Sequence, residues 1–380
     1  MSSLAALLGV TALAADLSGQ IAYVSGAEQE DQCVCLMDLA SGEVTRLGPG
    51  DRDGAPVWSP DGQWLAFETK RGGGMGICLA RHDGSERVDV PHRFEWNRRP
   101  RWSPAGSDEA PGGPLRVAYA SNDWRAFAPR IMVYDLDSGT ETQWGGEASS
   151  LARPVWMPNM KLLDALQAGQ RLLWGGPESD LTGQEWLEGE SALVAVFFKK
   201  GPAGLTTDLF LLTEDHAVGL PEFALPSRGC YAEWAVEPSP DGERVAFESN
   251  DGGDREIFVL TKKGSADVSN HRAADWNPVW SPDSEWIAFE SFRDGRRGLY
   301  RVYPDTARVL PVAVTPDADN WWPTWSPDGQ AMAFVSNRSG DPELFVADLT
   351  KKGEDGARTW RLTEHPGFDY APAWRPEVEP

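Results

Sequence analysis

The chain has 380 residues, of which 41% are hydrophobic, and its 58 Asp and Glu against 35 Lys and Arg give a formal net charge of −23. This apolar share is enough for a real core, and an acidic surface repels phosphate backbones, so nucleic acid is not an expected partner. Beyond Ala15, no segment reaches the roughly 18 consecutive apolar residues that a transmembrane helix needs.

The first residues differ in composition from the rest of the chain. Met1 to Ala15 are small and apolar, and Ala12-Leu13-Ala14-Ala15 resembles a signal-peptidase site. We expect residues 1–16 to be a signal or a flexible apolar segment and residues 17–380 to be one domain. The expected localisation is periplasmic or extracellular, with the cytoplasm as the alternative.

A short sequence, Trp-Ser-Pro-Asp-Gly before a strand containing Ala-Phe, recurs along the chain. Its copies and weaker variants begin at Trp58, Trp102, Trp156, Pro238, Trp280, Trp325 and Trp374, at intervals of 44, 54, 82, 42, 45 and 49 residues. Pro fixes φ, Asp bonds its own backbone and Gly tolerates positive φ, so each copy predicts a tight turn. A strand-rich period of roughly 40 to 50 residues predicts an all-β fold, a β-propeller.

The second strands of the repeats begin near Gln20, Leu65, Val117, Leu193, Val245, Ile287 and Met332. They predict seven blades of four antiparallel strands, or six if the irregular fourth unit is not a blade. That unit holds the excess length, which we interpret as an insertion at about 159–192. The first unit lacks an innermost strand, and the sequence around Trp374 supplies one, so we expect the C-terminal and N-terminal strands to pair and close the ring.

Propeller ligands usually bind at the mouth of the central channel, where loops lead into the innermost strands. In each of the seven repeats we take the residue five positions before the motif residue. Six of these seven residues are acidic or amides, namely Asp53, Asn97, Glu233, Asp275, Asn320 and Asp369, and the exception is Leu151. One residue later stand Arg98 and four aromatic residues, Trp234, Trp276, Trp321 and Tyr370. Aromatic faces beside carboxylates can bind a sugar, a cation or a peptide. Equally, the polar residues can cap their loops and the rings can pack between blades.

Other residues give weaker indications of a metal site, a basic surface or a disulfide. Asp53, Asp275 and Asp369 offer oxygen ligands of the kind that calcium prefers, and no other cofactor is expected. His92, His271 and His365 precede their motif residues by nine or ten positions, which would suit a metal-dependent enzyme, although exposed loop histidines are the simpler interpretation. Arg98, Arg99 and Arg101 form a short basic cluster, which we interpret as a solvated loop. The four cysteines contain no Cys-x-x-Cys pair; Cys35 and Cys78 are expected in the core, and a disulfide remains open.

The repeat resembles the WD40-like repeat of the TolB-type propeller family. The resemblance rests on Trp-Ser-Pro-Asp-Gly, on Ser-x-Arg-x-Gly as in 336–340, on the strand Leu344-Phe345-Val346 and on Leu362-Thr363. It implies a propeller, and similar blades serve as periplasmic interaction platforms, as gating domains of serine peptidases and in polysaccharide lyases. The sequence shows no α/β segment ahead of its repeats, such as precedes the ring of TolB, and no Gly-x-Ser-x-Gly.

Two functions follow as hypotheses. The first is a non-enzymatic propeller that binds a protein or peptide through its channel mouth, with no catalytic residues. The second is a carbohydrate-active or metal-dependent lyase or hydrolase that uses the same face, with a saccharide as ligand. The two differ in whether carboxylates and histidines converge within hydrogen-bond reach of one another.

Overall fold

The computed structural model describes residues 18–28, 31–47, 52–71, 73–92, 94–104, 115–122, 128–146, 151–159, 161–162, 193–201, 204–212, 214–215, 217–219, 235–250, 253–353, 356–364 and 367–377. Its regular structure is almost entirely β-strand. The apolar segment 1–16, nearly all of the expected insertion, Glu233, Trp234 and His365 lie outside these residues. Among the described residues, no helix is long and apolar enough to span a membrane.

The strands of the first half pair into antiparallel runs of four. One run joins β28 (Phe368–Trp374), β1 (Gln20–Gly26), β2 (Cys33–Asp38) and β3 (Val44–Arg46). The next is β4 (Gly54–Trp58), β5 (Trp64–Arg71), β6 (Gly74–Arg81) and β7 (Arg87–Asp89). It is followed by β8 (Trp96–Trp102), β9 (Arg116–Asn122), β10 (Arg130–Asp135) and β11 (Thr140–Trp144).

The remaining strands repeat this order. They form the runs β12 (Leu151–Trp156), β13 (Leu193–Gly201), β14 (Gly204–Leu212) and β15 (Ala217–Gly219), then β16 (Val236–Pro238), β17 (Val245–Ser249), β18 (Glu256–Thr261) and β19 (Gly264–Asp267). The last two are β20 (Asp275–Trp280), β21 (Ile287–Ser291), β22 (Gly298–Tyr303) and β23 (Arg308–Ala313), then β24 (Asn320–Trp325), β25 (Ala331–Ser336), β26 (Glu343–Gly353) and β27 (Gly356–Arg361). Single pairs, Met75 with Trp96 and Ala313 with Gly356, join neighbouring runs.

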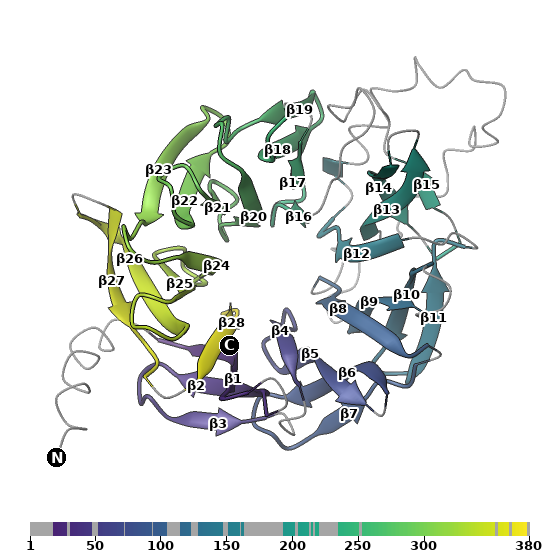
Figure 1. Ribbon diagram of the computed structural model, residues 1–380. Helices are drawn as coiled ribbons and strands as arrows, with labels where there is room; N and C mark the ends of the chain where they lie inside the picture. Colours follow the sequence, from purple (N-terminus) through teal and green to yellow (C-terminus); the bar gives the residue numbers. More distant parts are fainter. Residues whose placement is uncertain are drawn as a thin grey trace.

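The sheets stand around a common axis with the first strand of each run innermost (Figure 1). The C-terminal β28 lies beside the N-terminal β1, and the two are paired antiparallel from Ile21 with Trp374 to Gly26 with Phe368. The predicted all-β, propeller-like architecture of four-stranded antiparallel sheets is therefore confirmed, and the innermost strand of the first run comes from the other end of the chain.

The core lies between sheets. The described residues form seven apolar clusters, and each combines side chains from two neighbouring runs. The cluster around Phe67 includes Leu36 of the preceding run, and the cluster around Ala333 includes Ile21 and Tyr23 of the first run. A four-stranded sheet cannot bury both of its faces alone, so each sheet depends on the sheets beside it.

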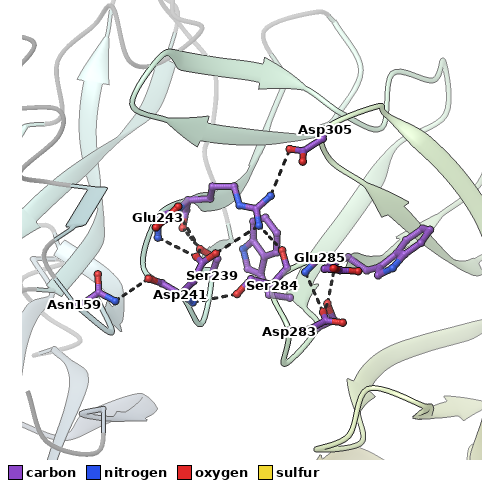
Figure 2. Close-up of polar contacts among 12 residues, drawn as sticks. Asn159, Ser239, Asp241, Glu243, Asp283, Ser284, Glu285 and Asp305 are labelled. Carbon is purple, nitrogen blue, oxygen red and sulfur yellow. Dashed lines mark hydrogen bonds and ion pairs between the residues drawn. The ribbon is translucent and has the colours of Figure 1, made fainter. Parts of the chain in front are cut away.

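The repeated turn has the local bonds that its sequence predicts. In each strong copy the Ser hydroxyl donates to the Asp carboxylate, as Ser326 does to Asp328 at 2.6 Å, and accepts the N–H of the residue five positions further on. Turns of neighbouring runs also bond to each other (Figure 2): the Asp241 N–H donates to the Ser284 hydroxyl at 3.0 Å, and Asn159 donates to the Asp241 carbonyl at 2.8 Å. The turns thus link three successive innermost strands on one side of the ring.

The motif tryptophan joins each innermost strand to the one before it. In five cases its indole N–H donates to a backbone carbonyl of the previous run, at 2.9 to 3.1 Å. The acceptor is always the residue just before the motif position of that run. The pairs are Trp58 to Ala373, Trp102 to Val57, Trp156 to Arg101, Trp280 to Glu237 and Trp325 to Val279. The bond from Trp58 reaches β28, so it ties the second run to the C-terminal strand. Trp374 differs, because its buried indole N–H has no acceptor among the described residues.

Because Trp325 has this hydrogen bond and Trp374 does not, the contribution of the indole bond to stability can be measured. Trp325 and Trp374 are equally buried, each with 7% of its surface exposed. Substitution by Phe removes the same ring atoms at both sites but a hydrogen bond only at Trp325. We expect Trp325→Phe to lower the free energy of unfolding by about 1 kcal/mol more than Trp374→Phe, measured by urea unfolding followed by circular dichroism. Equal losses in the two variants would show that the indole bond contributes nothing.

Candidate functional site

The innermost strands β4, β8, β12, β20, β24 and β28 each have a bulge near their start. The pairing register slips there, for example between Trp276 and Val279, and the bulge contains a non-glycine residue at positive φ, three positions before the motif tryptophan. These residues are Ala55, Arg99, Arg153, Asn277, Trp322 and Ala371, with φ between 48° and 59°. Such a conformation costs about 1 kcal/mol or more per residue, and bulges commonly re-aim side chains next to functional sites. We call the side of the ring on which the innermost strands begin the mouth face.

The N–H of a bulged residue leaves the strand ladder and needs another acceptor. In three runs a glutamate of the preceding sheet provides it: Glu68 accepts the N–H of Arg99 at 2.8 Å, Glu248 that of Asn277 at 2.7 Å and Glu290 that of Trp322 at 2.8 Å. These glutamates follow the repeated Ala-Phe. They fix the bulges of the mouth face to the neighbouring sheets.

Two of these carboxylates are buried and paired with arginine. Glu290 bonds the Arg297 Nε at 2.5 Å and the Asn277 amide at 3.0 Å, and Glu248 lies 3.4 Å from Arg255. Burial raises the pKa of both carboxyl groups, while the arginines and the donated N–H groups act in the opposite direction. The bulges are therefore held by buried ion pairs rather than by exposed ones.

The acidic and amide positions of the sequence analysis are buried where the structure describes them. Asp275 has no exposed surface and forms an ion pair with Arg293 at 2.8 Å; Asn320 likewise accepts from Arg338 at 2.7 Å. Both arginines belong to the Ser-x-Arg turn of the same run, so this turn bonds to the start of the innermost strand. The contacts give these two residues a structural role in addition to the predicted ligand-binding one.

The other members of this set are also buried. Asn97 donates to the carbonyls of Met75 and Phe94 and accepts from Ser121 at 2.6 Å. The backbone N–H groups of Asp53 and Asp369 donate to carbonyls of neighbouring segments, Gln32 and Pro342. Both carboxylates are at most 1% exposed. No three of the His, Cys, Asp and Glu residues in the described ranges gather in a group that could hold a metal ion.

The described aromatic residues of the next position, with Phe292 and Trp322, form two groups of contacting rings. Trp276 contacts Phe292, whose ring centre is 5.4 Å away, and Trp321 contacts Trp322 at 6.4 Å, which in turn contacts Tyr370 at 5.5 Å. Trp276, Trp321 and Tyr370 are half-buried, and Trp322 is 40% exposed. We call these five residues the aromatic row; it runs over β20, β24 and β28.

Arginines complete the row. The Arg297 guanidinium lies 5.6 Å from the Trp276 ring centre and 5.7 Å from that of Trp321, so it bridges the two rings. Arg255 lies 5.1 Å from Trp276. Cation–π contacts of this kind contribute about 0.5–2 kcal/mol and fix the rings in place. Tyr370 is held by its hydroxyl, which donates to Gln32 at 2.7 Å. The row is thus pre-formed.

The remaining candidates occupy different surroundings. Arg98 is exposed and lies 5.3 Å from the Trp96 ring. His271 is exposed and its Nδ1 accepts from the Ala273 N–H, while a ring nitrogen of His92 contacts the Val90 carbonyl. Cys33, Cys35 and Cys78 are buried and form no disulfide among the described residues, in agreement with the core position expected for two of them.

Several residues of the mouth face were missed by sequence reasoning. Glu248, Glu290, Arg297 and Trp322 received no role, although a signal existed. A glutamate stands at a strand position, next to Ala-Phe, that is otherwise apolar, as at Val335. A buried charged position in a repeat indicates a specific partner.

The pair of Asp275 and Arg293 gives a direct test of the structural role. Asp275→Ala leaves a largely buried guanidinium without its partner, and we expect a loss of about 3 kcal/mol of stability. Asp275→Asn should cost clearly less, because Asn320 shows that an amide satisfies the same arginine position. Thermal and urea unfolding of both variants measure this. A fully stable Asp275→Ala variant would assign the carboxylate to another role.

Comparison with known proteins supports the fold. No family model matches the chain. A segment of 135 residues is 33% identical to an uncharacterized protein of Agrobacterium fabrum, covering 32% of this chain and 43% of that protein. A segment of 84 residues is 30% identical to the Tol-Pal system protein TolB of Acinetobacter baylyi, covering 22% and 20%. The matches thus span less than half of each curated relative.

Similar solved structures extend over most of the chain. They include TolB from Acinetobacter baumannii (TM-score 0.54, 16% identity, 94% of this chain and 67% of that one). The β-propeller domain of the Trilobed protease from Pyrococcus furiosus gives 0.62 at 12%, over 92% and 95%. An oligogalacturonate lyase in complex with manganese gives 0.58 at 16%, over 87% and 86%. At such identities the likeness shows the fold alone: this chain is a β-propeller similar to that of TolB.

Proposed function

We propose that this propeller is a non-enzymatic interaction platform, and that its mouth face binds a protein or peptide partner. The platform is a ring of seven blades, one for each four-stranded run, closed by β28 and β1. A scaffold role is what a TolB-like propeller suggests, and the aromatic row provides a surface for it. We place the encounter with the partner in the periplasm or outside the cell, as the apolar segment 1–16 suggests.

The observation that carries this proposal is the position of the exposed apolar side chains. Among the described residues, large hydrophobic side chains that are clearly exposed are Val44, Phe292, Trp322 and Phe368. Three of them lie on the mouth face: Phe292 follows β21 beside the start of β20, Trp322 lies in the β24 bulge and Phe368 begins β28. An exposed apolar group of this kind, rimmed by polar residues, is typical of an interaction site.

The chemistry of the face also suits a macromolecular partner. Tryptophan, tyrosine and arginine are the residues that most often dominate the binding energy of protein interfaces. In the aromatic row they are held rigid by Arg297, by Glu290 and by the bulges, so little side-chain entropy would be lost on binding. A pre-formed row of rings is suited to an extended peptide or an exposed loop.

A carbohydrate-active or metal-dependent lyase or hydrolase is the second candidate. Its support is the same row, because half-exposed aromatic rings can stack on sugar rings. It would need an acid and a base at hydrogen-bond distance from one substrate. The rings of two described candidate histidines, His92 and His271, contact only backbone groups among the described residues, which favours the interaction platform.

The platform is tested by selecting random short peptides, displayed on phage, against the immobilised full chain. We expect enriched peptides whose affinity falls at least tenfold in Trp322→Ala, because truncation of a central aromatic residue typically costs more than 1 kcal/mol. Val44→Ser, which alters an exposed apolar residue on the outer strand β3, is the control and should bind normally. Isothermal titration calorimetry of the selected peptides measures both.

Two results would count against the platform. One is enrichment that is equally sensitive to Val44→Ser and to Trp322→Ala, which would indicate non-specific adhesion. The other is that no peptide is enriched and that the protein, in the presence of manganese, converts trigalacturonate. The product would then show the ultraviolet absorbance of an unsaturated sugar. That second result would establish the enzyme.

A further inference from the structure

Four arginines of the mouth face lie within electrostatic reach of one another through Arg153, and one of them, Arg255, contacts Trp276 of the aromatic row. Arg99 of β8 and Arg153 of β12 occupy the same bulge position of adjacent innermost strands. Arg101 lies two residues after Arg99 on β8, and Arg255 immediately precedes β18. Arg153 is within electrostatic reach of the other three. We call Arg99, Arg101, Arg153 and Arg255 the arginine cluster.

The carboxylates near this cluster do not balance it. Arg99 is in reach of Glu68 and Glu248, Arg153 of Glu248, and Arg101 of Glu237. Glu248 already pairs with Arg255 and accepts the Asn277 N–H, and Glu68 accepts the backbone N–H of Arg99. Exposed Arg98 adds a fifth positive charge to this side of the ring.

The guanidinium groups keep donors for a ligand. Among the described residues, neither Arg99 nor Arg153 forms an ion pair, and each guanidinium has five N–H donors in a planar fork that matches a carboxylate. Burial and the neighbouring arginines lower the pKa of Arg153 to about 10. Arg99 is exposed, and it lies within electrostatic reach of Arg98 and Arg101. A bound anion would offset the repulsion between these guanidinium groups.

The sign of the cluster is unusual for this chain. The whole molecule has a formal net charge of −23, so five arginines on one side of the mouth face form a local exception. Like charges placed together destabilise a compact fold by repulsion, and a ligand of opposite charge relieves that repulsion. Because the total field repels anions at long range, attraction would act only within about a Debye length of the cluster.

We propose that the arginine cluster is an anion subsite of the mouth face, and that it binds the carboxylates of an acidic peptide segment whose apolar side chains lie on the aromatic row. The inference rests on the proposed function and names the chemistry of its partner. Arg255 connects the two parts, since it pairs with Glu248 and also lies over the Trp276 ring at 5.1 Å. A ligand that carries both carboxylates and apolar groups could use both parts at once.

The test uses the peptides selected on the full chain. We expect them to carry an excess of Asp and Glu, and their affinity for the double variant Arg99→Gln/Arg153→Gln to be reduced about a hundredfold, roughly tenfold for each charge-assisted contact. Arg308→Gln, which alters an exposed arginine on the outer strand β23, should leave the affinity unchanged. Raising the ionic strength from about 0.1 M to about 1 M shortens the Debye length from roughly 10 Å to 3 Å and should weaken binding to the wild type far more than to the double variant.

Different results separate the two proposals. Peptides without acidic excess that still depend on Trp322 would overturn the anion subsite and leave the platform intact. Acidic peptides that bind the double variant as well as the wild type would also overturn it, provided that circular dichroism shows the variant folded. If the variant unfolds, Arg99→Lys/Arg153→Lys keeps both charges but loses the planar fork, and unchanged affinity there contradicts paired recognition of carboxylates. Binding of trigalacturonate, but of no peptide, would assign the cluster to an acidic saccharide and reject the acidic peptide.

Discussion

The hydrogen bond from the motif indole to the carbonyl of the preceding innermost strand sets the relative position of neighbouring sheets at five of their boundaries. Each four-stranded sheet has two faces to bury and can do so only against its neighbours. Stacked side chains such as Phe67, Phe247 and Phe289 provide the apolar burial, but apolar contacts tolerate sliding. The indole bond fixes the height of one strand relative to the next, because a donor and an acceptor must meet at about 3 Å. Trp58, which donates to Ala373, extends this relation to the C-terminal strand.

The bulges connect this scaffold to the mouth face. A residue inserted into the innermost strand changes which side chain is presented and releases its N–H from the ladder. Where the preceding sheet offers Glu68, Glu248 or Glu290, the released N–H is bonded across the boundary between sheets. The same contact that completes the backbone hydrogen bonding therefore places Arg99 and Trp322. Because the two residues lie on framework strands, the mouth face is more rigid than one built from free loops.

Charge is distributed unevenly over that face. The aromatic row lies over β20, β24 and β28, and the arginine cluster lies over β8, β12 and the residue before β18. Arg297 and Arg255 join them, since each pairs with a buried glutamate and also contacts a tryptophan ring. A partner with one apolar part and one acidic part would match this arrangement. A partner whose surface is uniformly acidic would leave the aromatic row without apolar contacts.

The sequence by itself determined the repeat, the turns, the order of strands and the positions near which a mouth face forms, because these depend on local rules of period and turn chemistry. It also indicated that Trp276, Trp321 and Tyr370 share one position in successive repeats. Only the tertiary structure decided that Asp275 and Asn320 are buried against arginines of their own turns. It also decided that Trp322 and Phe292 are the exposed rings, and that Arg99, Arg101 and Arg255 lie within electrostatic reach of Arg153. Spacing along a chain does not specify how a bulge rotates a side chain, and arginines of different runs come together only when the sheets are stacked.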